Sequence, residues 1–226
     1  VDTFHDFPKR EILEEFKSDT YKALDRGISI NPVLHAFQMV VNEYNIDRAL
    51  IDKFLESMEK DLNEITYSSL AYDDYIVGSA EVVGLMCLMV FVNGDKSLYD
   101  ELEDPARRLG AAFQKVNFLR DVKADFEDLG RSYFPGVNLT NFTHIEKLKI
   151  EADIAEDFHF ALEGIKKLPS SSKLGVYVAY RYYMSLFKKI KSVPSERLMH
   201  ERIRVANTKK LYITFKSYCR NQLNWI

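Results

Sequence analysis

Cysteine is nearly absent from this sequence, which excludes a disulfide scaffold. The 226 residues contain only Cys87 and Cys219, too few to build a cysteine metal site. Such a composition is typical of a reducing compartment, so we expect a cytoplasmic location. No signal peptide is recognisable, and the longest apolar run, Val82–Val92, is shorter than a helix that spans a bilayer. The sequence therefore predicts neither secretion nor a transmembrane helix.

An excess of positive charge is also missing, and so are the short motifs of nucleotide and zinc chemistry. With 31 Lys and Arg against 34 Asp and Glu, the formal net charge is −3, which gives no electrostatic case for nucleic acid. The sequence contains no P-loop, no Gly-x-Gly-x-x-Gly, no His-Glu-x-x-His and no Cys-x-x-Cys. We therefore expect no nucleic-acid partner, and the sequence does not predict the use of NADPH.

Apolar residues are plentiful, and their spacing is helical. Hydrophobic residues make up 46% of the chain and aromatic residues 13%, enough for one sizeable core. The spacing predicts about eight helices and no convincing strand, and hence a single-domain all-α bundle. Counting short pieces separately, we expect ten helical segments, near residues 9–26, 32–45, 47–63, 69–93, 97–103, 105–128, 144–151, 153–168 and 174–191, and a last one that ends near residue 225.

In one stretch, residues 112–125, polar side chains that could bind a ligand recur at helical spacing. On a helix with about 100° per residue, Asp121 and Asp125 return to within about 20° of Gln114, and Asn117 lies about 60° to one side. Carboxylates one turn apart repel each other unless a cation lies between them. Oxygen ligands suit Mg²⁺ or Mn²⁺, which complete their shell with water and phosphate oxygen. The stripe predicts a metal–diphosphate clamp; the alternative is a solvated acidic helix face.

Around this stripe the sequence resembles the squalene/phytoene synthase family. The resemblance is carried by the family's second aspartate-rich motif, written here as Gln114-x-x-Asn117-x-x-Arg120-Asp121-x-x-x-Asp125 and followed by Arg131-x-Tyr133-x-Pro135. The segment 75–84 resembles the family's Tyr/Gly-rich helix. The family's diphosphate-contact segment is matched by Arg181-Tyr-Tyr183, His200-Glu-Arg202 and Lys209-Lys210. The likeness covers essentially the whole chain, and the segments 79–86 and 133–135 are closer to phytoene synthases than to squalene synthases.

The resemblance implies a prenyltransferase with the isoprenoid-synthase fold, a helical bundle around a central cavity. It implies Mg²⁺-dependent head-to-head condensation of two geranylgeranyl diphosphates to phytoene, through a cyclopropyl diphosphate, in carotenoid biosynthesis. Squalene or dehydrosqualene synthesis from farnesyl diphosphate is the alternative within the family. A degenerate, non-catalytic bundle that acts as an interaction protein is the alternative of another class. The sequence leaves open the substrate length, the use of NADPH and the oligomeric state.

The resemblance also assigns roles to individual residues. The metal ligands would be Asp2, Asn117, Asp121 and Asp125. The catalytic residues would be Asp121, Asp125 and Tyr75, the last because an aromatic face stabilises a carbocation. The residues that contact the substrate diphosphate would be Gln114, Asn117, Arg120, Tyr183, Arg202 and Lys210.

Asp2 matches only the last aspartate of the family's first aspartate-rich motif. In the family that motif lies on a helix facing the second motif, and its earlier aspartate has no counterpart in this sequence. We therefore expect a fragment that lacks N-terminal helices. Residues 1–226 alone should bind metal–diphosphate poorly and should not turn over.

The helix expected over residues 69–93 should form the wall of a prenyl tunnel. It carries the small residues Gly78, Ser79, Ala80 and Gly84, although a glycine inside a helix costs about 1 kcal/mol relative to alanine. The resemblance implies that Tyr75 and Met86 line this tunnel. Close helix packing is the alternative explanation for the glycines.

Two further expectations concern the surface. Lys115 stands where the family more often has an apolar residue, and it faces away from the stripe, so we expect it at the surface or an edge. Peripheral contact with a membrane is compatible with a water-insoluble product, although no amphipathic anchor stands out in the sequence.

Overall fold

The computed structural model describes residues 8–62, 69–127, 133–137 and 142–226 of the chain, without the side chains of residues 69 and 124–127. Asp2 lies outside the described residues, and so does the side chain of Asp125. The described residues form helices and connecting turns, with no strand among them. The elements are α1 (Lys9–Arg26), α2 (Pro32–Tyr44), α3 (Arg48–Lys60), α4 (Ser69–Ile76), the π-helix η1 (Val77–Glu81), α5 (Val82–Phe91), α6 (Lys96–Glu127), α7 (His144–Lys167), α8 (Ser170–Lys191), α9 (Ser195–Leu198) and α10 (Asn207–Gln222).

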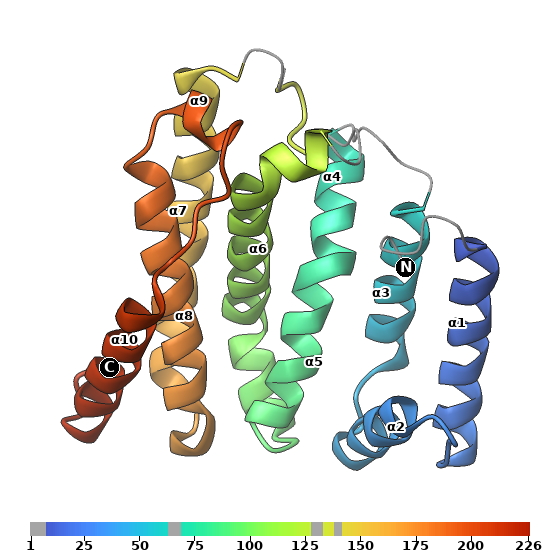
Figure 1. Ribbon diagram of the computed structural model, residues 1–226. Coiled ribbons are helices and arrows are strands. Elements are labelled where there is room, and N and C mark those ends of the chain that lie inside the picture. The colour runs from blue at the N-terminus through green and yellow to red at the C-terminus, as the bar shows by residue number, and fades with distance from the viewer. Residues whose placement is uncertain (1–7, 63–68, 128–132, 138–141) are drawn as a thin grey trace.

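The long helices stand side by side, so the prediction of an all-α bundle is confirmed (Figure 1). α6 occupies the middle and contacts α5 and η1 on one side and α7 and α8 on the other. α1 and α3 lie beyond α4 and α5, and α10 packs against α8. This arrangement makes α6 the central wall between the two halves of the bundle.

The N-terminal helices begin and end close to the expected residues, and local capping interactions account for these bounds. Gly27 follows α1 with φ of 68° and donates its N–H to the carbonyl oxygen of Ala23, a left-handed conformation that glycine adopts without a Cβ penalty. The side chain of Asn31 caps α2 and that of Asp47 caps α3, each by accepting backbone N–H groups of the first turn. Short-range chemistry therefore fixes these boundaries.

The break expected at residues 104–105 does not exist. α6 is one helix from Lys96 to Glu127 with Pro105 inside it, although an internal proline costs about 3 kcal/mol. Pro105 fits because α7 carries Gly164 opposite it, where an added Cβ would lie only 2.2 Å from the Pro105 Cβ. A tertiary contact thus overrides the local signal. The two segments expected near 144–151 and 153–168 are likewise one helix, α7.

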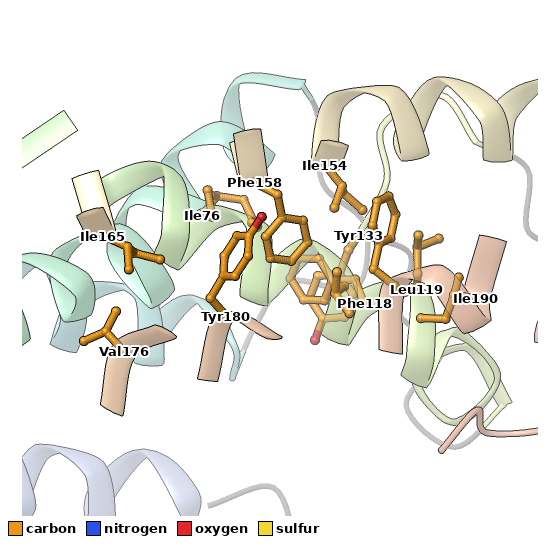
Figure 2. Close-up of a cluster of buried hydrophobic side chains, with 14 of the residues drawn as sticks. Ile76, Phe118, Leu119, Tyr133, Ile154, Phe158, Ile165, Val176, Tyr180 and Ile190 are labelled. Carbon is orange, nitrogen blue, oxygen red and sulfur yellow. The ribbon is translucent and has the colours of Figure 1, made fainter. Parts of the chain in front are cut away.

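The main core lies around α6 and α7 (Figure 2). Phe118 of α6 stacks on Tyr133 with ring centroids 3.9 Å apart, and Phe158 of α7 meets Tyr180 of α8 edge-on at 5.6 Å. Burying such side chains contributes about 1.5–3 kcal/mol each. A second, smaller cluster joins α1, α2 and α3. The first core holds α6 rigidly between its neighbours, which fixes the direction of its polar stripe.

α4, η1 and α5 form one continuous apolar rod. The stretch Leu70–Phe91 is long and apolar enough to cross a membrane by length and composition alone. The run Val82–Val92 identified in the sequence is therefore shorter than the apolar stretch of the folded helix. In the fold, this rod packs against α3 and α6, as expected for a core helix of a bundle. The π-helical turn in its middle was not predicted, and such turns are frequent at functional sites.

Candidate active site

A cavity of about 980 Å³ lies between α5, α6, α7 and α8. Its lining is largely apolar, with Val83, Leu109, Ile165 and Val176 each contributed by a different helix. The volume falls at the upper end of the roughly 300–1,000 Å³ common for small-molecule sites. Apolar walls of this kind can hold a hydrocarbon chain out of water. The expectation of a cavity beside the helix over residues 69–93 is confirmed.

Helices around the cavity approach one another closely at glycines. An added Cβ on Gly84 would lie 2.8 Å from the Ala106 carbonyl oxygen, and one on Gly110 would lie 2.5 Å from that of Ala80. An added Cβ on Gly78 would lie 1.8 Å from Ser57 Oγ of α3. Close helix packing therefore accounts for these glycines, and Gly84 and Gly110 also border the cavity. A side chain at Gly84 would push α5 away from α6, and one at Gly110 would push η1 away from α6.

The polar stripe of α6 begins at this cavity. Gln114 lines the cavity, and one turn later Asn117 Oδ1 accepts a hydrogen bond of 3.3 Å from the Tyr183 hydroxyl of α8. The Tyr183 ring stacks on Phe113, with centroids 3.9 Å apart and planes 15° apart. Phe113 itself faces the cavity. Amide oxygens and stacked aromatic rings thus meet where α6 and α8 flank the apolar chamber.

Asp121, one turn beyond Asn117, is held by two guanidinium groups. Arg202 Nε donates to Asp121 Oδ1 at 2.6 Å and its Nη2 to Oδ2 at 3.3 Å. Arg120 Nε donates to Oδ1 at 3.0 Å and to Oδ2 at 3.1 Å. The Asp121 side chain is 20% exposed, so this cluster is within reach of a ligand. Guanidinium groups that converge on one accessible carboxylate are also suited to hold an anion.

The oxygen donors at this site have the chemistry of a hard-cation site. Asp121 offers a carboxylate, and Asn117 and Gln114 offer amide oxygens on the same helix face, which are ligands that Mg²⁺ and Mn²⁺ accept. Among the described side chains, no group of three or more His, Cys, Asp or Glu residues is placed to hold a metal. The described donors therefore fit an ion that takes much of its shell from water and substrate oxygen.

Three expected residues lie elsewhere. Tyr75 is buried in the main core, where its ring lies 6.0 Å from Phe118 and its hydroxyl donates to Asp61 at 3.0 Å. Met86 packs against the small N-terminal cluster. Neither belongs to the cavity lining, so the expectation that they line the tunnel is wrong. Both sit on faces of the apolar rod that other helices cover. Lys210 is exposed in the first turn of α10, and within the described residues no ion pair joins it to Asp121.

Lys115 is buried, which corrects the expectation of a surface position. Its ammonium donates to Asp153 at 2.6 Å and to Asp157 at 2.7 Å, both on α7. Asp157 is fully buried and also accepts from Arg108 at 2.7 Å. Burial by itself lowers the pKa of Lys115, but the two hydrogen bonds outweigh it and the pKa is raised. In the sequence, the two aspartates four residues apart on α7 were the feature that could have indicated partners for a buried lysine.

Comparison with known proteins places these features in a family. The family model described as Squalene/phytoene synthase matches residues 1–209. The chain is 30% identical over 196 residues to a 15-cis-phytoene synthase of Pantoea ananas, covering 79% of this chain and 61% of that protein. It is 25% identical over 146 residues to a 4,4'-diapophytoene synthase of Staphylococcus haemolyticus, covering 64% of this chain and 48% of that protein. The chain thus spans between about half and three fifths of the length of these relatives.

The fold has a close counterpart among solved structures. A crystal structure of a dehydrosqualene synthase in complex with a ligand superposes with a TM-score of 0.79 at 17% sequence identity. The match covers 93% of this chain and 78% of that one. At this identity the likeness establishes the fold, a single helical bundle of the isoprenoid-synthase type.

Proposed function

Because this chain belongs to the squalene/phytoene synthase family, we propose that the protein joins two prenyl diphosphates head to head. The observation that carries the proposal is the continuity between the apolar cavity and the polar stripe of α6, from Gln114 through Asn117 to Asp121. A prenyl diphosphate has the same division, with a long apolar tail and a charged head. The cavity suits the tail, and the arginine cluster suits the head.

The cationic end would bind and orient the diphosphate. Arg120 and Arg202 already share Asp121, and charge-assisted hydrogen bonds from guanidinium groups to phosphate oxygens are strong and directional. Such fixed donors stabilise negative charge that develops as the diphosphate leaves. Tyr183 and Gln114 would position the carbon end of the head group at the mouth of the cavity. No conventional nucleophile is required.

We propose Asp121 and Asn117, together with Asp125 and Asp2, as the residues that would hold Mg²⁺ or Mn²⁺. When bound, the ion neutralises charge on the departing diphosphate. Asp121 contributes the only described carboxylate of this set, and it would exchange contacts with Arg120 or Arg202 for contacts with the ion. NADPH is not part of the proposal.

The carbocation that remains after departure of the diphosphate needs dry surroundings and aromatic faces. Phe113 provides such a face, because it lines the cavity and is stacked on Tyr183. Tyr75, which the sequence favoured for this role, lies in the packed core instead. In the proposed reaction, Phe113 and Tyr183 would shield and stabilise the cation until it is captured by the second prenyl chain.

We propose two geranylgeranyl diphosphates as substrates and phytoene as product, formed through a cyclopropyl diphosphate. The 30% identity to a 15-cis-phytoene synthase supports this choice. Synthesis of squalene or dehydrosqualene from farnesyl diphosphate is the alternative, supported by the likeness to a 4,4'-diapophytoene synthase. The test is incubation of the intact protein with labelled C20 and C15 diphosphates and Mg²⁺, with and without NADPH, followed by product identification. Phytoene from the C20 substrate alone is the expected result.

A non-catalytic bundle is the competing function of another class. It is favoured by the pairing of Asp121 with two arginines, which satisfies the carboxylate without any ion. The same incubation separates the two proposals. Binding of diphosphate without any product, at every Mg²⁺ and Mn²⁺ concentration, would favour the non-catalytic bundle.

A further inference from the structure

Residues 199–206 connect α9 to α10 and bring Arg202 to the α6 stripe (Figure 1). We call this segment the strap. Residues 201–206 have no regular secondary structure, so no helix or sheet fixes the direction in which Arg202 leaves the backbone. An arginine side chain also loses much rotamer freedom when it is ordered. The contacts that hold the strap therefore decide how well Arg202 meets Asp121.

One side of the strap is anchored by Ile203. Its side chain is 3% exposed and belongs to the main core, whereas Arg202 and Arg204 on either side of it are exposed. Such alternation is typical of an extended segment, in which successive side chains point to opposite sides. Apolar burial is not directional, so Ile203 alone does not fix how the strap is turned on the bundle.

Two lysines hold the strap by its backbone. Lys123 Nζ of α6 donates a hydrogen bond of 3.1 Å to the carbonyl oxygen of His200. Lys189 Nζ of α8 donates a hydrogen bond of 2.7 Å to the carbonyl oxygen of Arg204. The two acceptors stand two residues before and two residues after Arg202. The backbone is therefore held on both sides of the arginine.

These lysines come from the two helices that flank the polar end of the cavity. Asn117 of α6 and Tyr183 of α8 are joined there by a hydrogen bond. Lys123 and Lys189 each lie six residues further along the same helices, which is about 9 Å along the helix axis. The strap thus bridges α6 and α8 just beyond the Asn117–Tyr183 contact, at the end of the stripe where Asp121 lies.

We propose that Lys123 and Lys189 are positioning residues that clamp the strap and so present the Arg202 guanidinium to Asp121 and to the diphosphate. The inference rests on the proposed function, in which Arg202 binds the diphosphate. A donor stabilises developing charge most effectively when it is held in place before the reaction begins. The two lysines supply this support through the backbone and do not touch the substrate.

Direct attraction of the diphosphate by the two ammonium groups is the alternative, because any cation near the site attracts an anion. The two roles differ in one measurable respect. A residue that acts through Arg202 loses its effect on the substrate when Arg202 is removed. A residue that attracts the diphosphate itself keeps its effect.

Trypsin measures the hold on the strap without any catalysis. It cleaves after Arg202 and after Arg204, and cleavage requires local release of the chain. In the intact protein, Lys123→Met and Lys189→Met should each accelerate cleavage at these bonds about fivefold, as expected for loss of one exposed hydrogen bond from a charged donor. Lys188→Met removes a neighbouring exposed lysine of α8 and should leave the rate unchanged. Mass spectrometry identifies the cleaved bonds.

A double-mutant cycle in the intact protein tests the positioning role. Lys189→Met should raise KM for a prenyl diphosphate roughly three- to tenfold, and Lys189→Arg, which keeps a charged donor, should restore most of the wild-type value. In the Arg202→Ala background, adding Lys189→Met should change KM less than about twofold, because no guanidinium is left to position. Steady-state kinetics of the four variants and the wild type give these values.

Unchanged cleavage of the strap in both lysine variants would overturn the clamp. An undiminished effect of Lys189→Met in the Arg202→Ala background would overturn the positioning role and assign the lysine to direct attraction. An error in the proposed function gives a different result. The intact wild type would then neither bind nor turn over a prenyl diphosphate while the lysine variants still released the strap, and the positioning role would fall with the function.

Discussion

Arg202 reaches Asp121 from a segment 81 positions further along the chain, and its Nε lies 2.6 Å from the carboxylate. The contact joins the segment after α9 to the end of the α6 stripe. It brings the second of two guanidinium groups to a single carboxylate. The two guanidinium groups therefore come together only when the last part of the chain has folded against α6.

Replacing Arg202 should weaken binding of the diphosphate. Hydrogen bonds that involve a charged group contribute about 1.5–3 kcal/mol, so Arg202→Ala should raise KM for a prenyl diphosphate roughly 10- to 100-fold. Arg204→Ala removes a nearby exposed arginine and is the matched control. Steady-state kinetics of both variants, made in the intact protein, provide the measurement. Equal effects of the two substitutions would show that only the net charge of the segment matters.

Filling the cavity should shorten the prenyl chain that the protein accepts. Gly175 lines the cavity, and an added Cβ there has no neighbour within 4 Å, so Gly175→Leu should fold normally and occupy part of the space for the tail. We expect the preference between C20 and C15 diphosphates to shift toward C15, as measured by competition between labelled substrates. Gly84→Leu is the contrasting variant, because the Ala106 carbonyl blocks its Cβ; it should lower stability. If Gly175→Leu kept an unchanged preference for the C20 substrate, the prenyl tail would not bind in this cavity.

Cys87 offers a chemical probe of the same cavity. It is exposed to the cavity, and burial among apolar atoms raises its pKa, so little reactive thiolate forms at neutral pH. Alkylation of Cys87 should accelerate as pH rises, and a prenyl diphosphate analogue should slow it. Cys219 of α10 lies outside the cavity lining and serves as the internal control. Mass spectrometry of the two peptides distinguishes them; equal protection of both thiols would contradict occupation of the cavity.

The buried ion pairs of Lys115 should be needed for stability. Removing one partner of a buried pair costs about 3–5 kcal/mol, so Lys115→Met should lower the free energy of unfolding by that order. Lys115→Met combined with Asp157→Leu should recover part of the loss, since no buried charge remains at position 157 and Arg108, the other partner of Asp157, is half-exposed. Urea unfolding of the single and double variants measures both effects. A double variant that is less stable than Lys115→Met would contradict this interpretation.

The same lysine predicts a dependence on alkaline pH. Its folded-state pKa is raised above the ordinary value of 10.5, so the folded state holds the proton more tightly than the unfolded state. Its contribution to stability is therefore complete below pH 10.5 and is lost as pH rises through the higher folded-state value. Wild-type protein should lose more stability in this range than Lys115→Met. Parallel stability curves above pH 10.5 would be the contrary result.

Local signals predicted those parts of the fold that depend on neighbours in sequence. Gly27, Asn31 and Asp47 mark helix boundaries because each acts on backbone groups within a few residues. The break expected at residues 104–105 was wrong because Gly164, the residue that accommodates Pro105, lies on another helix. Helical periodicity correctly predicted that Gln114, Asn117 and Asp121 lie on one helix, because α6 is uninterrupted over these residues.

What the sequence could not give are contacts between distant segments. Lys115 seemed a surface residue because Asp153 and Asp157 stand 38 and 42 positions away. Tyr75 was expected to face the tunnel. The helices that pack around α4, η1 and α5 decide which side of this stretch meets the cavity, and the sequence does not show them. The hold of Lys123 on the strap was missed for the same reason, because its acceptor at His200 stands 77 positions away.

The central claim is that the α6 stripe acts on a prenyl diphosphate through Asp121, and its most direct test is turnover of labelled geranylgeranyl diphosphate by Asp121→Asn in the intact protein. The substitution keeps the size of the side chain and removes its charge. We predict a loss of turnover of roughly 100-fold or more, with helix content and thermal stability close to those of the wild type. Turnover within about threefold of the wild type would contradict the claim, and Asp121 would then be only a structural partner of Arg120 and Arg202.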